Sequence, residues 1–88
     1  KKHYRYRIYT EHVNFHGVRD ILDKYFDGYT AYTGLGVWQG QTERNLTIEI
    51  IVPESRAVDI EAACRKINRT NKQTCCLVTV DRVLAVFI

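Results

Sequence analysis

The residue of this chain best suited to bind or react with a ligand is Glu43, a carboxylate in a polar segment between two aromatic-rich runs. The stretch from Gly28 to Ile51 reads GYTAYTGLGVWQGQTERNLTIEII. Glu43 follows Gly40 and Gln41 at the expected mouth of two strands, where a carboxylate could reach a ligand lying across a subunit boundary. The alternative is a solvated loop glutamate, which is the commoner situation for such a residue, and residue types alone leave both interpretations open.

Two aromatic residues accompany this carboxylate. Tyr32 and Trp38 lie in the run before the turn, and either could offer a ring face to an adenine or to a cation, which gains roughly 0.5–2 kcal/mol over an aromatic ring. The alternative is that both are half-buried sheet aromatics. We therefore take Glu43 and Tyr32 as candidate catalytic residues, and Trp38 and Gln41 as candidate substrate-binding residues.

The cysteines and histidines predict neither a metal site nor a disulfide framework. The cysteines are odd in number: Cys64, Cys75 and Cys76. Two of them are adjacent, and neighbouring strand residues point to opposite faces of a sheet, so no disulfide framework follows. No CxxC spacing occurs, and the three histidines lack a partner set with ligand spacing. We expect no metal, no cofactor and a reducing cytoplasm.

Length and charge exclude several classes of function. Eighty-eight residues predict one domain, residues 1–88. Thirteen Lys and Arg against ten Asp and Glu give a net charge of +3, which is too mild to indicate a nucleic-acid groove or a membrane-surface helix. No apolar run is long enough to span a bilayer, so we expect a soluble cytoplasmic protein without nucleic-acid or membrane partners.

Hydrophobic periodicity predicts strands and helices in alternation. Period-two and helical spacings indicate strands over 3–12, 29–39, 44–52, 74–80 and 83–88, and helices over 14–28 and 55–67. Asn14 and Ser55 are the expected N-caps, Gly28 is expected to close the first helix, and Asp81 with Arg82 is expected to join the last two strands. Glycines 34 and 36 suggest a bulge or a close approach by a ligand or backbone.

This order, βαββαβ with an additional C-terminal strand, predicts a ferredoxin-like α+β sandwich with both helices on one face of an antiparallel sheet. The opposite face then needs cover. Tyr9, Ile51 and the apolar C-terminal strand would supply it through packing between copies, with closed cyclic symmetry as the usual outcome. We expect a homo-oligomer, and a trimer rather than a dimer.

The layout resembles the bacteriophage S-adenosylmethionine lyases, formerly described as S-adenosylmethionine hydrolases. The resemblance rests on YRIYTEH, GYTAYTGLGVWQGQTER, LTIEIIV, AACRKIN and QTCCLVTV in this order, and PII-like nucleotide-binding proteins share the topology. It implies that Glu43 matches the family's functional glutamate before the third strand, and that Tyr32 matches an aromatic on the preceding strand. It also implies a trimer that holds S-adenosylmethionine between subunits.

The resemblance further implies a reaction that requires neither a strong general base nor a metal from the protein. If the methionine tail of S-adenosylmethionine folds back, its own carboxylate displaces the thioether at the γ-carbon and gives homoserine lactone and 5′-methylthioadenosine. Phage enzymes of this kind destroy the methyl donor of host restriction and modification systems. Two alternatives stay open: a PII-like or anti-defence protein that binds a nucleotide without turnover, and an interaction domain whose C-terminal strand joins a partner sheet.

Overall fold

Alternating apolar residues build the central strand of the sheet. In the computed structural model, which describes residues 2–88, strand β1 runs from Lys2 to Glu11. Tyr6, Ile8 and Thr10 are buried on one face of this strand, as the period-two pattern predicts. β1 therefore occupies the middle of the fold and contacts a strand on each side.

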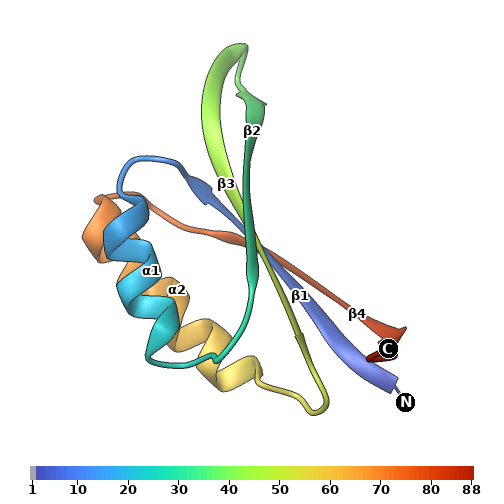
Figure 1. Cartoon of the computed structure of the whole chain (residues 1–88). Coiled ribbons are helices and arrows are strands. Elements are labelled where there is room, and N and C mark those ends of the chain that lie inside the picture. The colour runs from blue at the N-terminus through green and yellow to red at the C-terminus, as the bar shows by residue number, and fades with distance from the viewer. Residues whose placement is uncertain (1) are drawn as a thin grey trace.

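The four strands form one antiparallel sheet in the order β2-β3-β1-β4. Strand β2 spans Thr30–Trp38, β3 spans Gln41–Val52 and β4 spans Leu77–Leu84. Figure 1 shows the β2–β3 hairpin projecting beyond the rest of the sheet, away from both chain termini. This order is the one that a βαββαβ chain produces when each helix crosses the same face.

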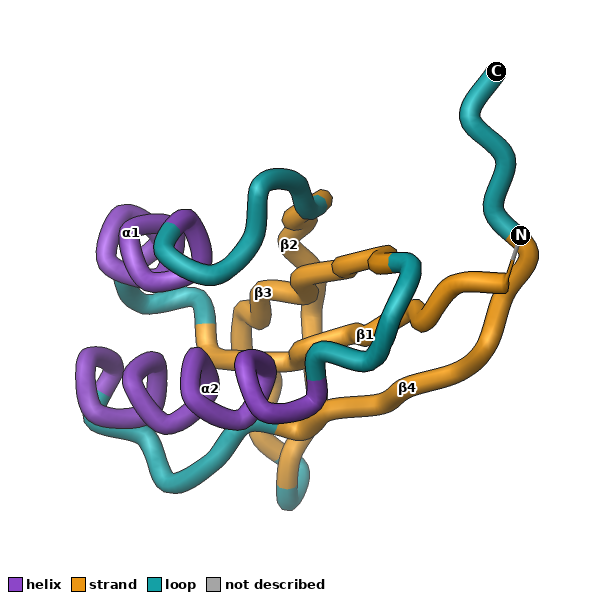
Figure 2. The backbone as a smooth tube through the Cα atoms, turned by 90° about the horizontal axis from the view of Figure 1, so that it is seen from below, coloured by secondary structure: helices purple, strands orange, loops and turns teal. Residues whose placement is uncertain are grey.

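Both helices cover one face of the sheet and leave the other face open (Figure 2). Helix α1 spans Phe15–Asp23 and α2 spans Ala57–Asn71, and no helix within residues 2–88 is long and apolar enough to cross a membrane. The core between helices and sheet is formed by Tyr6, Ile8, Val18, Ile21, Leu22, Phe26, Leu46, Ile48, Ile50, Ile60, Ala63, Cys64 and Ile67. The predicted ferredoxin-like α+β class is confirmed.

The first helix begins as predicted and ends earlier. The side chain of Asn14 accepts a hydrogen bond of 3.0 Å from the backbone N–H of Gly17, so Asn14 is the N-cap. The helix ends at Asp23 rather than near Gly28. Closure by Gly28 was therefore a wrong prediction: Phe26 turns into the core, with 4% of its surface exposed, before the chain reaches that glycine.

The second helix does not use its predicted cap. Arg56 is the N-cap residue of α2 and makes no capping hydrogen bond through its side chain. The hydroxyl of Ser55 instead hydrogen-bonds the phenol of Tyr6 at 3.3 Å, and the same phenol accepts from the backbone N–H of Arg56 at 3.2 Å. The hydroxyl of the buried Tyr6 thus accepts a backbone N–H at the beginning of α2, where a serine cap was predicted.

The hairpin between β2 and β3 turns over two residues. Gln39 and Gly40 have φ angles of 50° and 77°, and positive φ at both central residues is the signature of a type I′ hairpin turn. The predicted longer turn is therefore wrong, and Glu43 lies inside β3, opposite Gly36. Pairing is continuous from Thr30 to Trp38, so the predicted bulge does not occur.

One strand replaces the two predicted at the C-terminal end. β4 runs through Asp81 and Arg82, because both residues have partners on β1. The carboxylate of Asp81 forms an ion pair of 2.7 Å with Arg5, and the guanidinium of Arg82 lies 4.6 Å from the ring centroid of Tyr4. The additional strand is thus absent: residues 85–88 continue past β4 without strand pairing.

Candidate functional site

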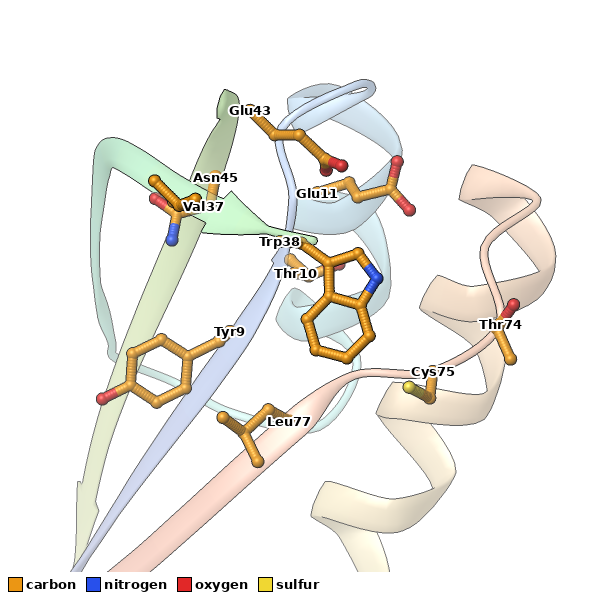
Figure 3. Close-up of a pocket in the computed structure, with 11 residues that line it drawn as sticks. Tyr9, Thr10, Glu11, Val37, Trp38, Glu43, Asn45, Thr74, Cys75 and Leu77 are labelled. Atoms are coloured by element: carbon orange, nitrogen blue, oxygen red, sulfur yellow. The ribbon is translucent and has the colours of Figure 1, made fainter. Parts of the chain in front are cut away.

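A cavity of about 560 Å³ lies where the β2–β3 hairpin, the end of β1 and the segment between α2 and β4 meet (Figure 3). Its walls are mainly apolar and carry two carboxylates. The residues that line it are Tyr9, Thr10, Glu11, Gly36, Val37, Trp38, Glu43, Asn45, Thr74, Cys75 and Leu77. Two of the four predicted site residues, Glu43 and Trp38, are among them.

Glu43 reaches the cavity because its position on β3 has no crowded neighbour. It lies opposite Gly36, which has no side chain to contact it. Within residues 2–88 its carboxylate makes no hydrogen bond or ion pair, and Figure 3 shows it directed toward Glu11. The carboxylate is therefore available to a ligand.

Trp38 forms one aromatic wall of the cavity, which Tyr9 also lines. It is the last residue of β2, and 69% of its surface is exposed. In Figure 3 its indole projects between the two carboxylates and Leu77. A ring in this position can lie against a flat heterocycle or a cation.

Tyr32 and Gln41 do not line the cavity. Tyr32 lies on the same face of the sheet opposite Thr47, whose partner on the other side is Tyr9, and 49% of its surface is exposed. Gln41 pairs with Trp38 next to the hairpin turn and is exposed. These two residues border the site rather than form it.

The glycines of β2 make room for one side chain of β3. A Cβ atom on Gly34 would lie 3.1 Å from the side-chain oxygen of Asn45, and one on Gly36 would lie 3.5 Å from its nitrogen. Asn45 thus lies over both glycines and lines the cavity beside Glu43. The nearest neighbour of these glycines is thus the Asn45 side chain, rather than the ligand or backbone that the sequence suggested.

Hydrogen bonds hold the wall formed by the segment between α2 and β4. The amide nitrogen of Gln73 donates to the hydroxyl of Thr10 at 2.8 Å, to the side-chain oxygen of Asn68 at 3.1 Å and to the carbonyl of Cys75 at 3.1 Å. This network fixes Cys75, which lines the cavity, relative to β1. Behind it, a hydrogen bond from Cys64 lowers the pKa of the Cys76 thiol.

The sequence did not identify Glu11, Tyr9 or the segment around Cys75 as parts of the site. The predicted strand order could have identified Glu11. Antiparallel pairing brings the end of β1 beside the beginning of β3, so a glutamate at the end of β1 lies near Glu43. Within the described residues 2–88, the cavity included, no group of three or more His, Cys, Asp or Glu side chains is placed to hold a metal ion.

The fold defines a class, the small ferredoxin-like α+β proteins. No family model and no curated protein matches the sequence. Similar solved structures include a phage SAM lyase in complex with S-methyl-5′-thioadenosine, with a TM-score of 0.72, 18% identity, and coverage of 90% of this chain and 80% of the lyase. SAM is S-adenosylmethionine.

Two further structures share the fold. CPII, a nitrogen regulatory PII-like protein from Thiomonas intermedia K12 bound to ADP, AMP and bicarbonate, has a TM-score of 0.69, 18% identity, and coverage of 100% of this chain and 98% of its own. A DUF3240 family protein from Shewanella baltica OS155 has a TM-score of 0.71, 12% identity, and coverage of 98% and 94%. At these identities the likeness establishes the fold alone.

Proposed function

We propose that this protein is a SAM lyase that converts SAM to homoserine lactone and 5′-methylthioadenosine. One observation carries the proposal: Glu43, a carboxylate without a partner within residues 2–88, and Trp38, an exposed aromatic ring, line one cavity. These groups suit a ligand that has both a flat heterocycle and a cationic centre. The shared fold with a phage SAM lyase bound to S-methyl-5′-thioadenosine supports this choice.

The reaction is an intramolecular displacement. A carboxylate oxygen of SAM forms a bond to its own γ-carbon while the bond from that carbon to sulfur breaks, and the electron pair stays on sulfur. The sulfonium becomes a neutral thioether, so neither a base nor a metal is needed. A protein assists by fixing the folded tail, since well-oriented intramolecular reactions gain up to roughly 7–11 kcal/mol, and by excluding water.

Each candidate residue has a role in this proposal. Glu43 orients the substrate through its amino group or ribose hydroxyls and offsets the sulfonium charge while the tail folds. Trp38 holds the adenine or the cationic centre. Tyr32 and Gln41, exposed at the border of the cavity, contact the part of the ligand that extends toward a neighbouring subunit.

The assembly we propose is a homotrimer with sites between subunits. The exposed edge strand supports it: Leu77, Val80 and Leu84 of β4 are 63%, 55% and 75% exposed, and Phe87 beyond it is 90% exposed. An open apolar edge of this kind is normally covered by another chain. Light scattering of the purified protein measures the subunit number, and a monomer at all concentrations would contradict the proposal.

A second candidate function is binding of an adenine nucleotide without turnover. CPII, which shares the fold over the whole chain, was solved with ADP and AMP bound. In that case the cavity would sequester or sense a nucleotide, and SAM would be returned unchanged if it bound at all.

The deciding experiment is incubation of the protein with SAM in water enriched in oxygen-18, with products followed by mass spectrometry. The lyase function predicts 5′-methylthioadenosine together with homoserine lactone that carries no solvent oxygen at the earliest times. Solvent oxygen in the first-formed product would indicate hydrolysis instead. Unchanged SAM would overturn catalysis and favour the binding function. For either function, we propose that the protein acts in the cytoplasm of a phage-infected bacterium.

A further inference from the structure

The charges that line the cavity are all of one sign. Glu11 and Glu43 are its two ionisable carboxylates, and the lining residues include no Lys, Arg or His. A pocket of this composition repels phosphate groups and attracts cations. The charge of a ligand therefore decides how well it suits this lining.

On the sheet face that carries Glu11 and Glu43, the other charged residues of β1 are paired with residues of opposite charge. Arg7 forms an ion pair of 2.9 Å with Glu49 on β3, and Arg5 forms one of 2.7 Å with Asp81 on β4. Toward the hairpin this pairing stops. Glu11, the last residue of β1, makes no side-chain hydrogen bond or ion pair within the described chain, so its negative charge is left for a ligand.

Strand register brings the two carboxylates to one ligand. Glu11 lies opposite Asn45, and Glu43 lies two residues from Asn45 on the same face of β3. Such diagonal neighbours are separated by roughly 7–8 Å between backbones, which leaves room for a cationic group between the side chains. Figure 3 shows the two carboxylates above the indole of Trp38.

We infer that Glu11 is the charge-selecting residue of this site, and that the ligand class it selects is adenosine derivatives with a cationic sulfur or amine on the 5′ side. This inference rests on the proposed function and deepens it. In SAM the cationic group at this position is the sulfonium, and Glu11 and Glu43 offset its charge together. S-adenosylhomocysteine lacks the sulfonium charge, and ADP brings phosphates against both carboxylates.

Equilibrium binding of three adenosine ligands tests the inference. Sinefungin carries an amine in place of the sulfonium, S-adenosylhomocysteine is neutral at that position, and ADP is anionic. Each is titrated against the unmodified protein, Glu11→Gln and Glu11→Lys, with binding followed by isothermal calorimetry. The control is Glu54→Gln, an exposed glutamate in the connection between β3 and α2, at the other end of β3 from the hairpin.

The expected result is that the protein binds sinefungin more tightly than S-adenosylhomocysteine and ADP most weakly. Glu11→Gln reduces the preference for sinefungin over S-adenosylhomocysteine by about five- to tenfold, Glu11→Lys shifts the preference toward ADP, and Glu54→Gln changes neither. Added salt weakens the preference of the unmodified protein more than that of Glu11→Gln.

Two outcomes would overturn the inference, and they are distinguishable. If Glu11→Gln keeps the full preference while the protein still converts SAM, Glu11 does not select the ligand and the proposed lyase function stands. If the unmodified protein binds ADP more tightly than sinefungin and leaves SAM unchanged, both fail. Thermal unfolding of each variant is measured alongside; a lost preference in a variant with an unchanged unfolding temperature supports the inference.

Discussion

Glu43 lies directly opposite Gly36 in the β2–β3 hairpin, so the carboxylate has no side chain across the strand to pair with. Cross-strand pairs normally contribute roughly 0.2–1 kcal/mol to a sheet, and this position forgoes that contribution. On the neighbouring strand pair, Glu49 has Arg7 as an ion-pair partner on the same face. Unlike Glu49, Glu43 therefore has no ion-pair partner on the described part of the sheet, and its charge is free to interact with a ligand.

Glu43→Gln tests this role directly. The substitution keeps the size of the side chain and removes its charge, so we expect SAM turnover to fall on the order of tenfold to a hundredfold while the assembly and its stability persist. Tyr32→Phe, which changes a residue outside the cavity, should have a smaller effect. The measurement is the rate of 5′-methylthioadenosine formation, and full activity of Glu43→Gln would remove the residue from the mechanism.

Gly36 offers a test that leaves every charge in place. A Cβ atom there meets only ordinary contacts, with Asn45 at 3.5 Å, so Gly36→Ala should retain the fold and bind sinefungin nearly as well as the unmodified protein. Gly36→Leu projects a larger side chain into the cavity beside Glu43, and we expect it to weaken sinefungin binding by at least about tenfold, the effect of roughly 1.4 kcal/mol. Equal binding by both variants would place the ligand elsewhere.

Trp38 can report binding as well as contribute to it, because it is the only tryptophan in the chain. We expect sinefungin to change its fluorescence, and Trp38→Leu to weaken binding by about 0.5–2 kcal/mol. Leu35→Ala is the matched control, since Leu35 is an exposed apolar residue of the same strand that does not line the cavity. The substitutions are compared by calorimetry, and similar losses in both would indicate a general effect on the hairpin.

The fold was predictable because the core positions repeat with clean periods. Ile8, Ile48 and Ile67 are fully buried, and each lies on the face that its strand or helix pattern predicts. The C-terminal pair Asp81 and Arg82 was misread as a turn, since two adjacent charged residues are typical of loops. Their partners on β1 are distant in sequence, and only the assembled sheet shows that both charges are satisfied within a strand.

The site was predictable in part, and for a related reason. Glu43 and Trp38, which the sequence predicted as site residues because they flank an evident turn, both line the cavity. The turn itself is shorter than predicted, because Gln39 adopts a positive φ of 50°, which sequence patterns rarely assign to glutamine. Glu11 was not predicted because its place in the cavity depends on strand register. A carboxylate at the end of one strand becomes part of a cavity only when another strand places a second carboxylate beside it.

Tyr6 connects the core to the beginning of α2, and its removal should be costly. It is 4% exposed, and its hydroxyl accepts the backbone N–H of Arg56 at 3.2 Å. Tyr6→Phe leaves that N–H without its partner, so we expect a loss of about 1–3 kcal/mol in the free energy of unfolding. Urea denaturation measures it. Ser55→Ala, which removes only the exposed partner of the same phenol, should change stability by less than about 0.5 kcal/mol.

Tyr29 gives the protein a defined response to alkaline pH. Burial, and then a hydrogen bond of 2.7 Å from its hydroxyl to Asp23, raise the pKa of Tyr29 from an ordinary 10.0 to about 12. The folded state therefore retains this proton when the unfolded state loses it, so the stabilisation is present in full below pH 10 and disappears as the pH rises through about 12. Tyr29→Phe should flatten the stability profile across that interval, and the difference in tyrosinate absorbance between the two proteins should titrate near pH 12. A difference titration centred at pH 10 would mean that the phenol is neither buried nor bonded to Asp23 in solution.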